Sequence, residues 1–496
     1  MPNVKREKLY SVMNSMLVTQ RRIPAEEQAW LNDSFVDPTG RVFEWYGEIY
    51  REIRANNTQF WNGLFQNGVI DELVRDGLLV DSEPTSFCTD AGGLVIHHRK
   101  ISVASYCFEW LPEMLQHAAI LTIDLCIRLA EKDLTLQDGH PWNILFEGTR
   151  PIFVDLGSVI PAREDILWAP YQQFCNFFLF PLYLYAAGQD RIARWLLRDY
   201  LCGVQEDDVL AALPLRFKIR HSRRTLGIAI PKVVGRLFEK LPEQSQQGLL
   251  QLSRNSSGGF ANRNTKLKFF DSLKKNITGL KLVGPASKWS RYYTTPDRKY
   301  FVTNLPPQEW QLKGLIVQTL IDRVRPSNVL DIGANAGYYA MLAALSGARV
   351  TACELDIGAL SLCYEEAGKF QELNILPLVC NVFSNSPIPG RGGCSYPPAT
   401  QRLRSELVMA LALVHHVVAE QRLNISRVVD ILNALSTRWL LVEYVKPLPP
   451  RTGASRVHGV DDYTSESFEA VLRHRFRSVE RFPSYPDDRK MFWCEK

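Results

Sequence analysis

The spacing of two glycines and two acidic residues in the second half of the chain could hold a nucleoside. Asp331 ends a short apolar run, and Gly333 and Gly337 bracket the turn that follows it. Glu354 comes 23 residues after Asp331, at the end of a β-branched run. Glycine lets the backbone approach a ligand closely, and the start of a helix behind it offers free N–H groups. Because a carboxylate at a strand end can accept two hydrogen bonds from ribose hydroxyls, these residues predict a ribose-containing ligand.

The elements that must position these residues are a strand, a turn, a helix and a second strand. Val329 and Leu330 indicate the first strand, and residues 338–345 are compatible with the helix. The turn between them contains Ala334 and Asn335. This order of elements is typical of a doubly wound α/β sheet.

The turn has an acid followed by Gly-x-x-x-Gly, which differs from the dinucleotide pattern Gly-x-Gly-x-x-Gly. It resembles motif I and the acidic second strand of class I S-adenosylmethionine (SAM) methyltransferases. The resemblance implies that SAM is the cofactor, with Asp331 near its amino group. The cofactor-binding residues that it implies are Asp331, Gly333, Ala334, Asn335, Gly337, Glu354 and Asn381. The alternative is a Rossmann-type turn that binds another nucleotide or no ligand.

Asn381 ends the third expected strand, over residues 374–381. Class I methyltransferases often have an Asp or Asn there that hydrogen-bonds the adenine. The resemblance therefore implies this role for Asn381, although relatives are expected to have Asp. Asn can still accept or donate a hydrogen bond.

A pair of histidines follows the fourth expected strand. Residues 405–416 are apolar until they reach His415 and His416. Ligands of open α/β folds bind at this carboxyl edge, and a neutral imidazole there could take a proton from an acceptor hydroxyl. Alternatively, the histidines fasten the junction between strand and helix. Glu443, at the end of a strand over residues 439–445, is a further candidate for contact with the acceptor or a histidine.

A second set of polar residues lies in the first half of the chain. Asp138 and Asn143 are five residues apart, and Asp155 comes twelve residues after Asn143 in Asp-x-Gly. The segment resembles the catalytic and metal-binding loops of protein kinases and aminoglycoside phosphotransferases. Phosphoryl transfer needs an Asp to orient a hydroxyl, and an Asn and a second Asp to hold Mg²⁺. The resemblance implies that Asp138 is the base and that Asn143 and Asp155 are metal ligands for Mg-ATP.

This loop departs from the kinase pattern in its surroundings. No glycine-rich phosphate loop and no Val-Ala-Ile-Lys strand precede it. Arg51 is the nearest candidate for the cation that pairs with phosphate, and Lys100 is a poorer one, but Arg is not interchangeable with that lysine. The alternative is that Asp138 and Asn143 fasten a turn. The region is therefore expected to be kinase-like in fold, with its activity degenerate.

The composition is that of an ordinary soluble protein. The chain has 496 residues, 46% of them hydrophobic and 22% charged, and a net charge of +5. No dense basic stripe interleaves with aromatics, so no nucleic-acid partner is expected. The ten scattered cysteines form no C-x-x-C or metal spacing, which indicates reduced thiols. Residues 174–187 are apolar but too short for a membrane span, and the chain is expected to be cytoplasmic.

The pattern along the chain predicts two domains and a linker. The expected fold is a C-terminal doubly wound, Rossmann-like α/β methyltransferase domain preceded by an α+β kinase-like domain. The expected boundaries are an N-terminal extension over 1–34, the kinase-like domain over 35–253, a linker over 254–284 and the methyltransferase domain over 285–496. Within the kinase-like domain, a small lobe covers about 35–110 and a helical lobe about 111–253. The junction aromatics Trp289, Tyr292 and Tyr293 are expected to roof the pocket or to fill an interdomain core.

Taken together, the two loops, the junction aromatics and the histidine pair look like the class I SAM methyltransferases related to the nodulation protein NoeA. The resemblance runs from about residue 35 to the C-terminus. It implies a methyltransferase, and it supplies neither the acceptor nor the oligomeric state. A nodulation setting would suggest a lipo-chitooligosaccharide or another saccharide.

Two alternatives to a simple methyltransferase stay open. One is a bifunctional enzyme that also phosphorylates its substrate through Asp138, Asn143 and Asp155. The other is a non-catalytic protein that binds SAM or a partner. Methyl transfer proceeds mainly through positioning and desolvation, so the lack of a certain base does not count against the enzyme.

Overall fold

The computed structural model is a mixed α/β fold. It describes residues 21–31, 37, 39–90, 92–222, 261–282, 284, 286–292, 312–370, 372–384, 388–389, 395–446 and 463–496. The predicted aromatic Tyr293 and most of the predicted N-terminal extension lie outside these residues.

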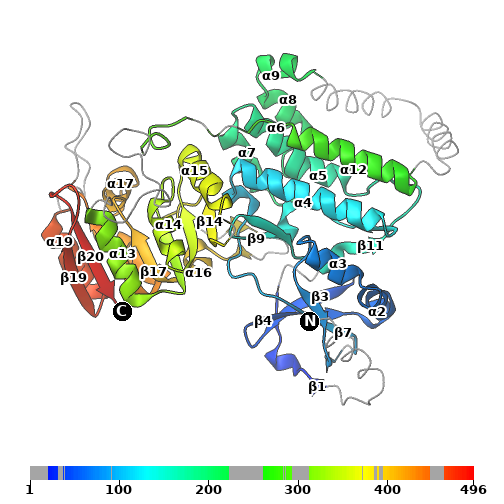
Figure 1. Cartoon of the computed structure of the whole chain (residues 1–496), viewed down its shortest axis with the longest axis horizontal. Helices are drawn as coiled ribbons and strands as arrows, with labels where there is room; N and C mark the ends of the chain where they lie inside the picture. Colours follow the sequence, from blue (N-terminus) through cyan, green and yellow to red (C-terminus); the bar gives the residue numbers. More distant parts are fainter. Residues whose placement is uncertain are drawn as a thin grey trace.

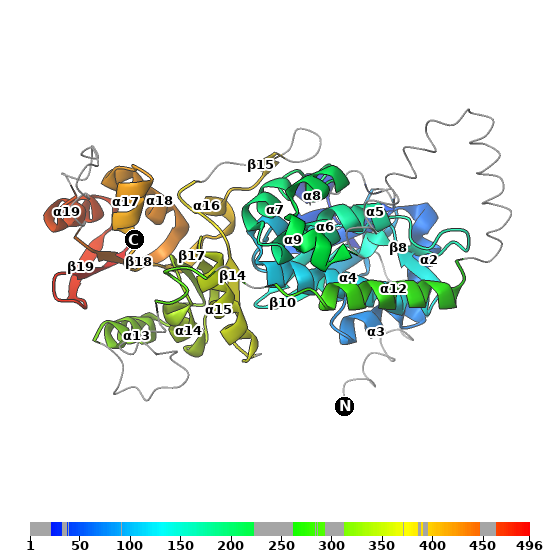
Figure 2. The ribbon, with the colours of Figure 1, turned by 90° about the horizontal axis from the view of Figure 1, so that it is seen from above.

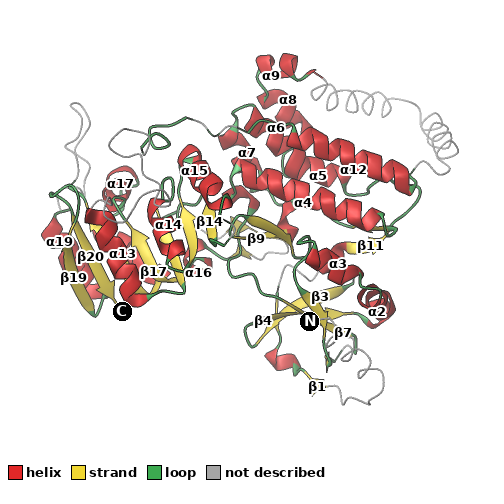
Figure 3. Cartoon of the chain, in the orientation of Figure 1, coloured by secondary structure: helices red, strands yellow, loops and turns green. Residues whose placement is uncertain are grey.

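The second half of the chain is built on a seven-stranded sheet in the order β14-β13-β12-β17-β18-β20-β19. The strands are β12 (Asn328–Ile332), β13 (Arg349–Cys353), β14 (Ile375–Leu378), β17 (Ser405–Ala410), β18 (Ser436–Tyr444), β19 (Ser478–Pro483) and β20 (Lys490–Glu495). The first five are parallel, while β20 runs antiparallel to both β18 and β19. Figure 3 shows these strands in yellow, flanked by helices. Parallel strands that are buried on both faces are rich in apolar residues, as these are.

Helices cover both faces of this sheet (Figure 2). On one side are α13 (Leu312–Val324), α14 (Tyr338–Leu345) and α15 (Ile357–Gly368). On the other are α16 (Ala399–Arg402), α17 (Val414–Glu420), α18 (Ile425–Leu435) and α19 (Ser465–Arg475). The expected doubly wound sheet is therefore present, and its antiparallel β19–β20 hairpin is an addition that the sequence did not predict.

The first half begins with a five-stranded antiparallel sheet in the order β2-β3-β4-β7-β5. Its strands are β2 (Ala29–Trp30), β3 (Gly40–Trp45), β4 (Glu48–Ile53), β5 (Ser82–Pro84) and β7 (Leu94–His98). Two helices, α2 (Thr58–Gln66) and α3 (Val69–Arg75), connect β4 to β5. A short parallel pair, β1 (Arg21–Arg22) and β6 (Phe87–Cys88), lies beside it.

A mostly helical part follows, and its central helix is α4 (Pro112–Ala130). Two hairpin-like strand pairs carry the polar loop: β8 (Leu134–Leu136) with β11 (Val159–Pro161), and β9 (Ile144–Glu147) with β10 (Arg150–Phe153). The later helices are α5 (Tyr171–Phe174), α6 (Phe180–Ala186), α7 (Asp190–Leu196), α8 (Glu206–Ala212) and α9 (Leu215–Arg220).

Part of the predicted linker is a helix instead. Within the expected linker over 254–284, α12 (Arg263–Thr278) packs along α4 (Figure 1). Asn262 caps its first turn by accepting a hydrogen bond from the Thr265 N–H at 3.0 Å. Phe270, Leu273 and Ile277 are buried at helical spacing. The Ser-, Gly- and Asn-rich residues before the helix concealed this apolar face.

The two halves of the chain share one hydrophobic core and meet along the β14 edge of the large sheet (Figure 1). Val379, just after β14, donates its N–H to the Glu109 carbonyl oxygen at 2.7 Å. The Glu109 carboxylate accepts a hydrogen bond from Arg402, and both side chains are about 95% buried. One backbone hydrogen bond and one buried ion pair therefore link the segment around Glu109 in the first half to the second half.

No helix in the described part of the chain is long and apolar enough to cross a membrane.

Candidate functional site at the carboxyl edge of the large sheet

A cavity of about 550 Å³ opens where β12, β13 and β17 end. Its volume lies in the range of small-molecule sites, and its place is the edge at which open α/β sheets bind ligands. Its walls come from the β12–α14 turn, the end of β13, the β17–α17 junction, the start of α13 and the β19–β20 loop. The structure thus brings most of the predicted cofactor and histidine residues to one cavity.

Glu354 holds the glycine turn against the end of β13. Its Oε2 atom accepts a hydrogen bond from the Asn335 N–H at 3.0 Å. Its Oε1 atom accepts from the N–H groups of Leu355 and Asp356 at 2.6 and 2.9 Å. Asn335 has a φ of +52°, a conformation that Asn tolerates better than most residues. Glu354, Asn335, Ala334 and Gly333 all line the cavity.

The two glycines of the turn have different roles. Gly333 lines the cavity with a φ of +75°, and a Cβ atom there would lie 3.1 Å from the side chain of Leu413. Gly337 has a φ of +85°, and a Cβ atom there would lie 2.4 Å from Cys363 Sγ on α15. Gly337 is not among the residues that line the cavity, so it serves the packing of α14 on α15 and contributes only indirectly to a ligand site.

Asp331 lies at the floor of the cavity and is 2% exposed. Its Oδ2 atom has no hydrogen-bond partner among the described residues. Burial, and to a lesser extent the nearby Glu354 carboxylate, raise the pKa of Asp331 to about 7 against the lowering effect of Lys313. A buried oxygen without a partner is costly, so the site is suited to a ligand that brings a cationic donor.

Glu443 is turned away from the histidines and bonded elsewhere. Lys313 Nζ donates to Glu443 Oε2 at 2.6 Å, and Ser484 Oγ donates to Oε1 at 2.5 Å. Glu443 is fully buried and does not line the cavity. Both oxygens are thus committed to the protein, and the expected contact with acceptor or histidine is absent from the described contacts. Glu443 instead positions Lys313, which does line the cavity.

The two histidines differ in their surroundings although their rings lie 4.1 Å apart. His416 lines the cavity, its Nδ1 atom lies 2.9 Å from Glu420 Oε1, and its ring meets Trp289 edge-on. His415 does not line the cavity, and its Nδ1 atom has no hydrogen-bond partner among the described residues. Burial, with smaller effects of His416 and Arg489, lowers the pKa of His415 to about 3. Of the two histidines, only His416 lines the cavity.

Asn381 reaches the cavity through a neighbour. Its Nδ2 atom donates to Gln421 Oε1 at 3.1 Å, and its Oδ1 atom accepts from the Phe383 N–H at 3.1 Å. Gln421 lines the cavity, whereas Asn381 does not. Of the junction aromatics, Trp289 and Tyr292 line the cavity, as a roof would.

Sequence reasoning missed several residues of this cavity. They are Lys313, Tyr338, Tyr339, Tyr485 and Arg489. Lys313 lies in the first turn of α13, before a run of apolar residues, and this is a signal that could have been noticed. Arg489 is brought in by the β19–β20 hairpin, for which the sequence offered no comparable signal.

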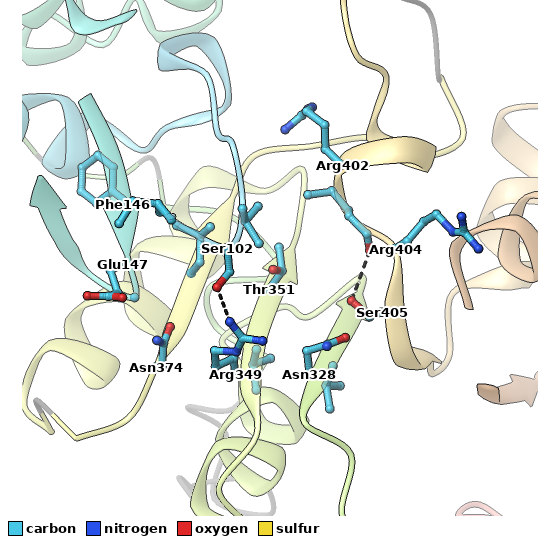
Figure 4. Close-up of a pocket in the computed structure, with 17 residues that line it drawn as sticks. Ser102, Phe146, Glu147, Asn328, Arg349, Thr351, Asn374, Arg402, Arg404 and Ser405 are labelled. Atoms are coloured by element: carbon cyan, nitrogen blue, oxygen red, sulfur yellow. Dashed lines mark hydrogen bonds between the residues drawn. The ribbon is translucent and has the colours of Figure 1, made fainter. Parts of the chain in front are cut away.

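A smaller cavity of about 100 Å³ lies at the opposite, amino edge of the same sheet, between the two halves of the chain (Figure 4). Ser102 of the first half accepts a hydrogen bond from Arg349 at the start of β13. Asn328, Thr351 and Ser405 also line this cavity. Its lining residues come from both halves of the chain, and it lies at the other end of the strands from the glycine turn. It is therefore a packing gap between the two halves rather than a cofactor site.

The polar loop of the first half is tied up by a buried arginine. Arg51, on β4, is 4% exposed and donates from Nη2 to Asp155 Oδ1 at 2.5 Å. Its Nη1 atom donates to Asp37. Asp155 therefore faces a cation of the protein where a metal ligand was predicted. Burial raises the pKa of Asp155 despite Arg51.

The other two residues of this loop face different partners. Asp138 accepts a hydrogen bond from Gln173 Nε2 at 3.4 Å, and its backbone N–H donates to Ser158 Oγ at 3.1 Å. Asn143 Nδ2 is buried without a partner among the described residues. Among all residues that the structure describes, no group of three or more His, Cys, Asp or Glu side chains could hold a metal ion. The contacts of Asp138 agree with the turn-fastening alternative.

Comparison with known proteins finds a similar protein over most of the chain. The nodulation protein NoeA of Rhizobium meliloti (strain 1021) is 27% identical over 465 residues, covering 90% of this chain and 92% of NoeA. The resemblance to NoeA that the motifs predicted is therefore confirmed. No protein-family model matches the chain.

Likenesses to solved structures are weak. The bifunctional kinase-methyltransferase WbdD is 15% identical with a TM-score of 0.27, and the match covers 36% of this chain and only 38% of WbdD. Magnesium protoporphyrin IX methyltransferase (ChlM) from Synechocystis PCC 6803, with bound SAM, is 10% identical with a TM-score of 0.28 over 43% of this chain and 100% of ChlM. Such scores carry no argument about function.

Proposed function

We propose that the chain is a SAM-dependent methyltransferase acting on a small-molecule or saccharide acceptor. The observation that carries the proposal is the Glu354–Asn335 hydrogen bond, which joins the glycine turn to the end of β13 beside a cavity of about 550 Å³. A carboxylate held at this point retains lone pairs for ribose hydroxyls. The similarity to a protein named for nodulation supports an acceptor from that setting, such as a lipo-chitooligosaccharide or another saccharide.

The residues present fit the cofactor. Asp331 Oδ2 is buried, lines the cavity and lacks a hydrogen-bond partner among the described residues, as expected of a group that receives an ammonium from a ligand. Glu354 would hold the ribose, and Gln421, oriented by Asn381, would meet the adenine edge. When bound, SAM supplies a methyl group that its sulfonium has already activated.

The residues of the chain would position the reacting groups and exclude water from them. Leu411, Ala412 and Leu413 form an apolar wall at the end of β17, which excludes water from the reacting groups. His416, hydrogen-bonded to Glu420, would accept the proton of a hydroxyl acceptor. His415 is the poorer base because its lowered pKa makes its neutral form weakly basic.

For the first half we propose a kinase-like α+β region that is degenerate in activity. The strand order β2-β3-β4-β7-β5, with two helices between β4 and β5, supports the kinase-like fold. Mg-ATP does not fit the polar loop as it stands, because Asp155 and Asp37 both bind Arg51. We therefore do not adopt the bifunctional alternative. The domain boundaries given above, with α12 added to the kinase-like region, are part of this proposal.

Calorimetric titration of SAM and S-adenosylhomocysteine tests the function. We expect micromolar affinity in the wild type and at least tenfold weaker binding in Glu354→Gln, which is the ~1.4 kcal/mol typical of losing charge-assisted hydrogen bonds. Glu365→Gln, an exposed substitution on α15, is the matched control and should bind as the wild type does.

A second variant guards against misfolding of the turn. Gln421→Ala removes the proposed adenine contact and leaves Glu354's hydrogen bonds in place, and it should also weaken SAM binding. Absence of SAM binding by the folded wild type would end the proposal. SAM binding without methyl transfer to any saccharide, lipid or protein pool would favour the non-catalytic alternative.

A further inference from the structure

The far end of the cavity from Glu354 carries a cation that the proposed cofactor contacts do not use. In the sheet, β12, β17 and β18 separate β13 from β20, and Arg489 precedes β20 directly. Adjacent strands lie about 4.8 Å apart, so four strand steps place Arg489 roughly 19 Å from the Glu354 strand. Arg489 nevertheless lines the same cavity as Glu354. A ribose at Glu354 therefore leaves Arg489 for another part of the site.

Arg489 is held in place by the fold rather than by a charge. Its loop is short, because Pro483 at the end of β19 pairs with Lys490 at the start of β20. Ser484 at one end of the loop is bonded to the buried Glu443 at 2.5 Å, and the Arg489 N–H donates to the Pro486 carbonyl oxygen at 3.0 Å. The backbone of the loop that carries Arg489 is thus anchored to the end of β18.

The charge of Arg489 is not balanced within the described part of the chain, where no carboxylate forms an ion pair with it. The other cation of the cavity, Lys313, is paired with Glu443. The neighbouring Asp487 and Asp488 are exposed and do not line the cavity. Arg489 acts on the interior of the site, since its charge contributes to the lowered pKa values of His415 and Lys313, both of which are lowered mainly by burial.

Four acids line the cavity: Asp331 has an oxygen without a partner among the described residues and is assigned above to the ammonium of the cofactor, and the other three already have partners. Glu354 accepts three backbone N–H groups. Asp356 caps α15 and accepts from Ser287 Oγ at 2.9 Å, and Glu420 is bonded to His416. A ligand group that meets Arg489 therefore has an unshared cation available to it.

Two aromatic side chains, Tyr485 and Trp289, line the same cavity as this cation. Tyr485, 54% exposed, and Pro486 form the rim on the Arg489 side, and Trp289 lines the cavity beside His416. Flat aromatic surfaces of this kind stack on rings of substrates, whereas the guanidinium binds carboxylates and phosphates with two parallel hydrogen bonds.

We propose that Arg489 is the specificity-determining residue of an acceptor subsite that selects a ring-bearing anion, with the anionic group held by Arg489 and the ring against Tyr485. This inference rests on the proposed methyltransferase function and names the substrate class for it. The anion is the recognition group, and the group near His416 is the one that would accept the methyl. A carboxylate and a phosphate share this chemistry.

Matched probes test the subsite in protein loaded with S-adenosylhomocysteine. Benzoate, phenyl phosphate and the neutral isostere benzamide are titrated and followed by ligand-observed NMR. We expect at least one anion to bind fivefold or more tightly than benzamide, and the better of the two identifies the preferred anionic group. Arg489→Gln should reduce this preference to less than twofold. Arg427→Gln, an exposed arginine on α18, should leave it unchanged.

Three results would overturn the inference. They are equal binding of anions and benzamide, no binding of any probe by the loaded protein, and a preference that persists in Arg489→Gln. Calorimetry with SAM separates this inference from the function. If Arg489→Gln weakens SAM binding tenfold, Arg489 belongs to the cofactor and the subsite is refuted. If the wild type binds no SAM, the proposed function itself fails.

Discussion

Lys313 and Glu443 form a buried ion pair, with 2.6 Å between Nζ and Oε2 and side chains that are 9% and 0% exposed. The pair links the first turn of α13 to the end of β18, and Ser484 extends it to the β19–β20 loop. Two cavity residues, Lys313 and Arg489, therefore depend on one buried carboxylate for their positions.

Removing one partner of this pair should destabilise the protein strongly. Glu443→Leu leaves Lys313 buried without a counterion, and we expect a loss of about 3–5 kcal/mol in the free energy of unfolding, measured by urea denaturation. The double variant Lys313→Met with Glu443→Leu should recover most of that loss. Lys275→Met, which breaks the exposed pair with Asp271, is the control and should cost less than about 1 kcal/mol. Additive losses in the double variant would contradict this account.

SAM binding should strengthen as the pH rises through the pKa of Asp331. That pKa is raised to about 7, mainly by burial, so Asp331 is largely protonated at pH 6 in the free protein. A cationic ligand favours the ionised form, and the affinity should rise about tenfold between pH 6 and 8, with release of a proton. Calorimetry in buffers of different ionisation enthalpy measures both. Asp331→Asn should bind more weakly and without this pH dependence, and a pH-independent wild type would refute the role.

His415 should make the protein sensitive to acid. Its folded pKa of about 3 lies below the ordinary 6.5, so its contribution to stability is present above pH 6.5 and is lost as the pH falls toward 3. Between pH 6.5 and 4.5 the wild type should lose about 2 kcal/mol through this residue, and His415→Gln should lose correspondingly less. Urea denaturation at both pH values measures the difference. The exposed His474→Gln serves as control, and identical pH dependence in all three proteins would count against the assignment.

The polar loop of the first half should not bind nucleotide. Because Arg51 binds Asp155, we expect no Mg²⁺-dependent ATP binding at about 1 mM ATP. The binding free energy of Mg-ATP would then be weaker than about −4 kcal/mol. Asp155→Ala should instead lower the free energy of unfolding by about 3–5 kcal/mol, since it strands part of the buried guanidinium charge. Detectable Mg-ATP binding that disappears in Asp155→Ala would restore the bifunctional alternative.

The sequence predicted the parts of the site that lie close together in the chain. Gly333, Asn335 and Glu354 belong to one strand–turn–helix–strand unit, whose local pattern determines their meeting at the cavity. Gly337 is predicted to bind the cofactor because glycine lets the backbone approach a ligand closely, and in the structure a Cβ atom at this position would collide with Cys363. A sequence pattern shows that a position requires glycine, but it does not show whether a ligand or a protein side chain leaves no room for a Cβ atom there.

The residues that sequence reasoning misplaced depend on distant partners. Glu443 ends a strand at the functional edge, as predicted, but its orientation follows from Lys313, 130 residues earlier. Arg489 enters the cavity only because β20 pairs antiparallel with β18, a register that no local signal encodes. The apolar face of α12 was hidden for a different reason, since polar residues typical of a linker precede it.

The stacking of Trp142 on Tyr396 limits which mutations each half of the chain can accept on its own. The rings lie 4.9 Å apart and nearly parallel. Trp142 belongs to the polar loop of the first half, whereas Tyr396 belongs to β16 (Ser395–Tyr396) of the second half, which pairs with β15 (Ile388–Pro389). Mutations in the loop are then constrained by the need to keep a surface for the neighbouring half. A chimera that exchanged only one half between relatives would have to carry matching residues on both sides of the seam, much as the subunits of an obligate heterodimer co-evolve.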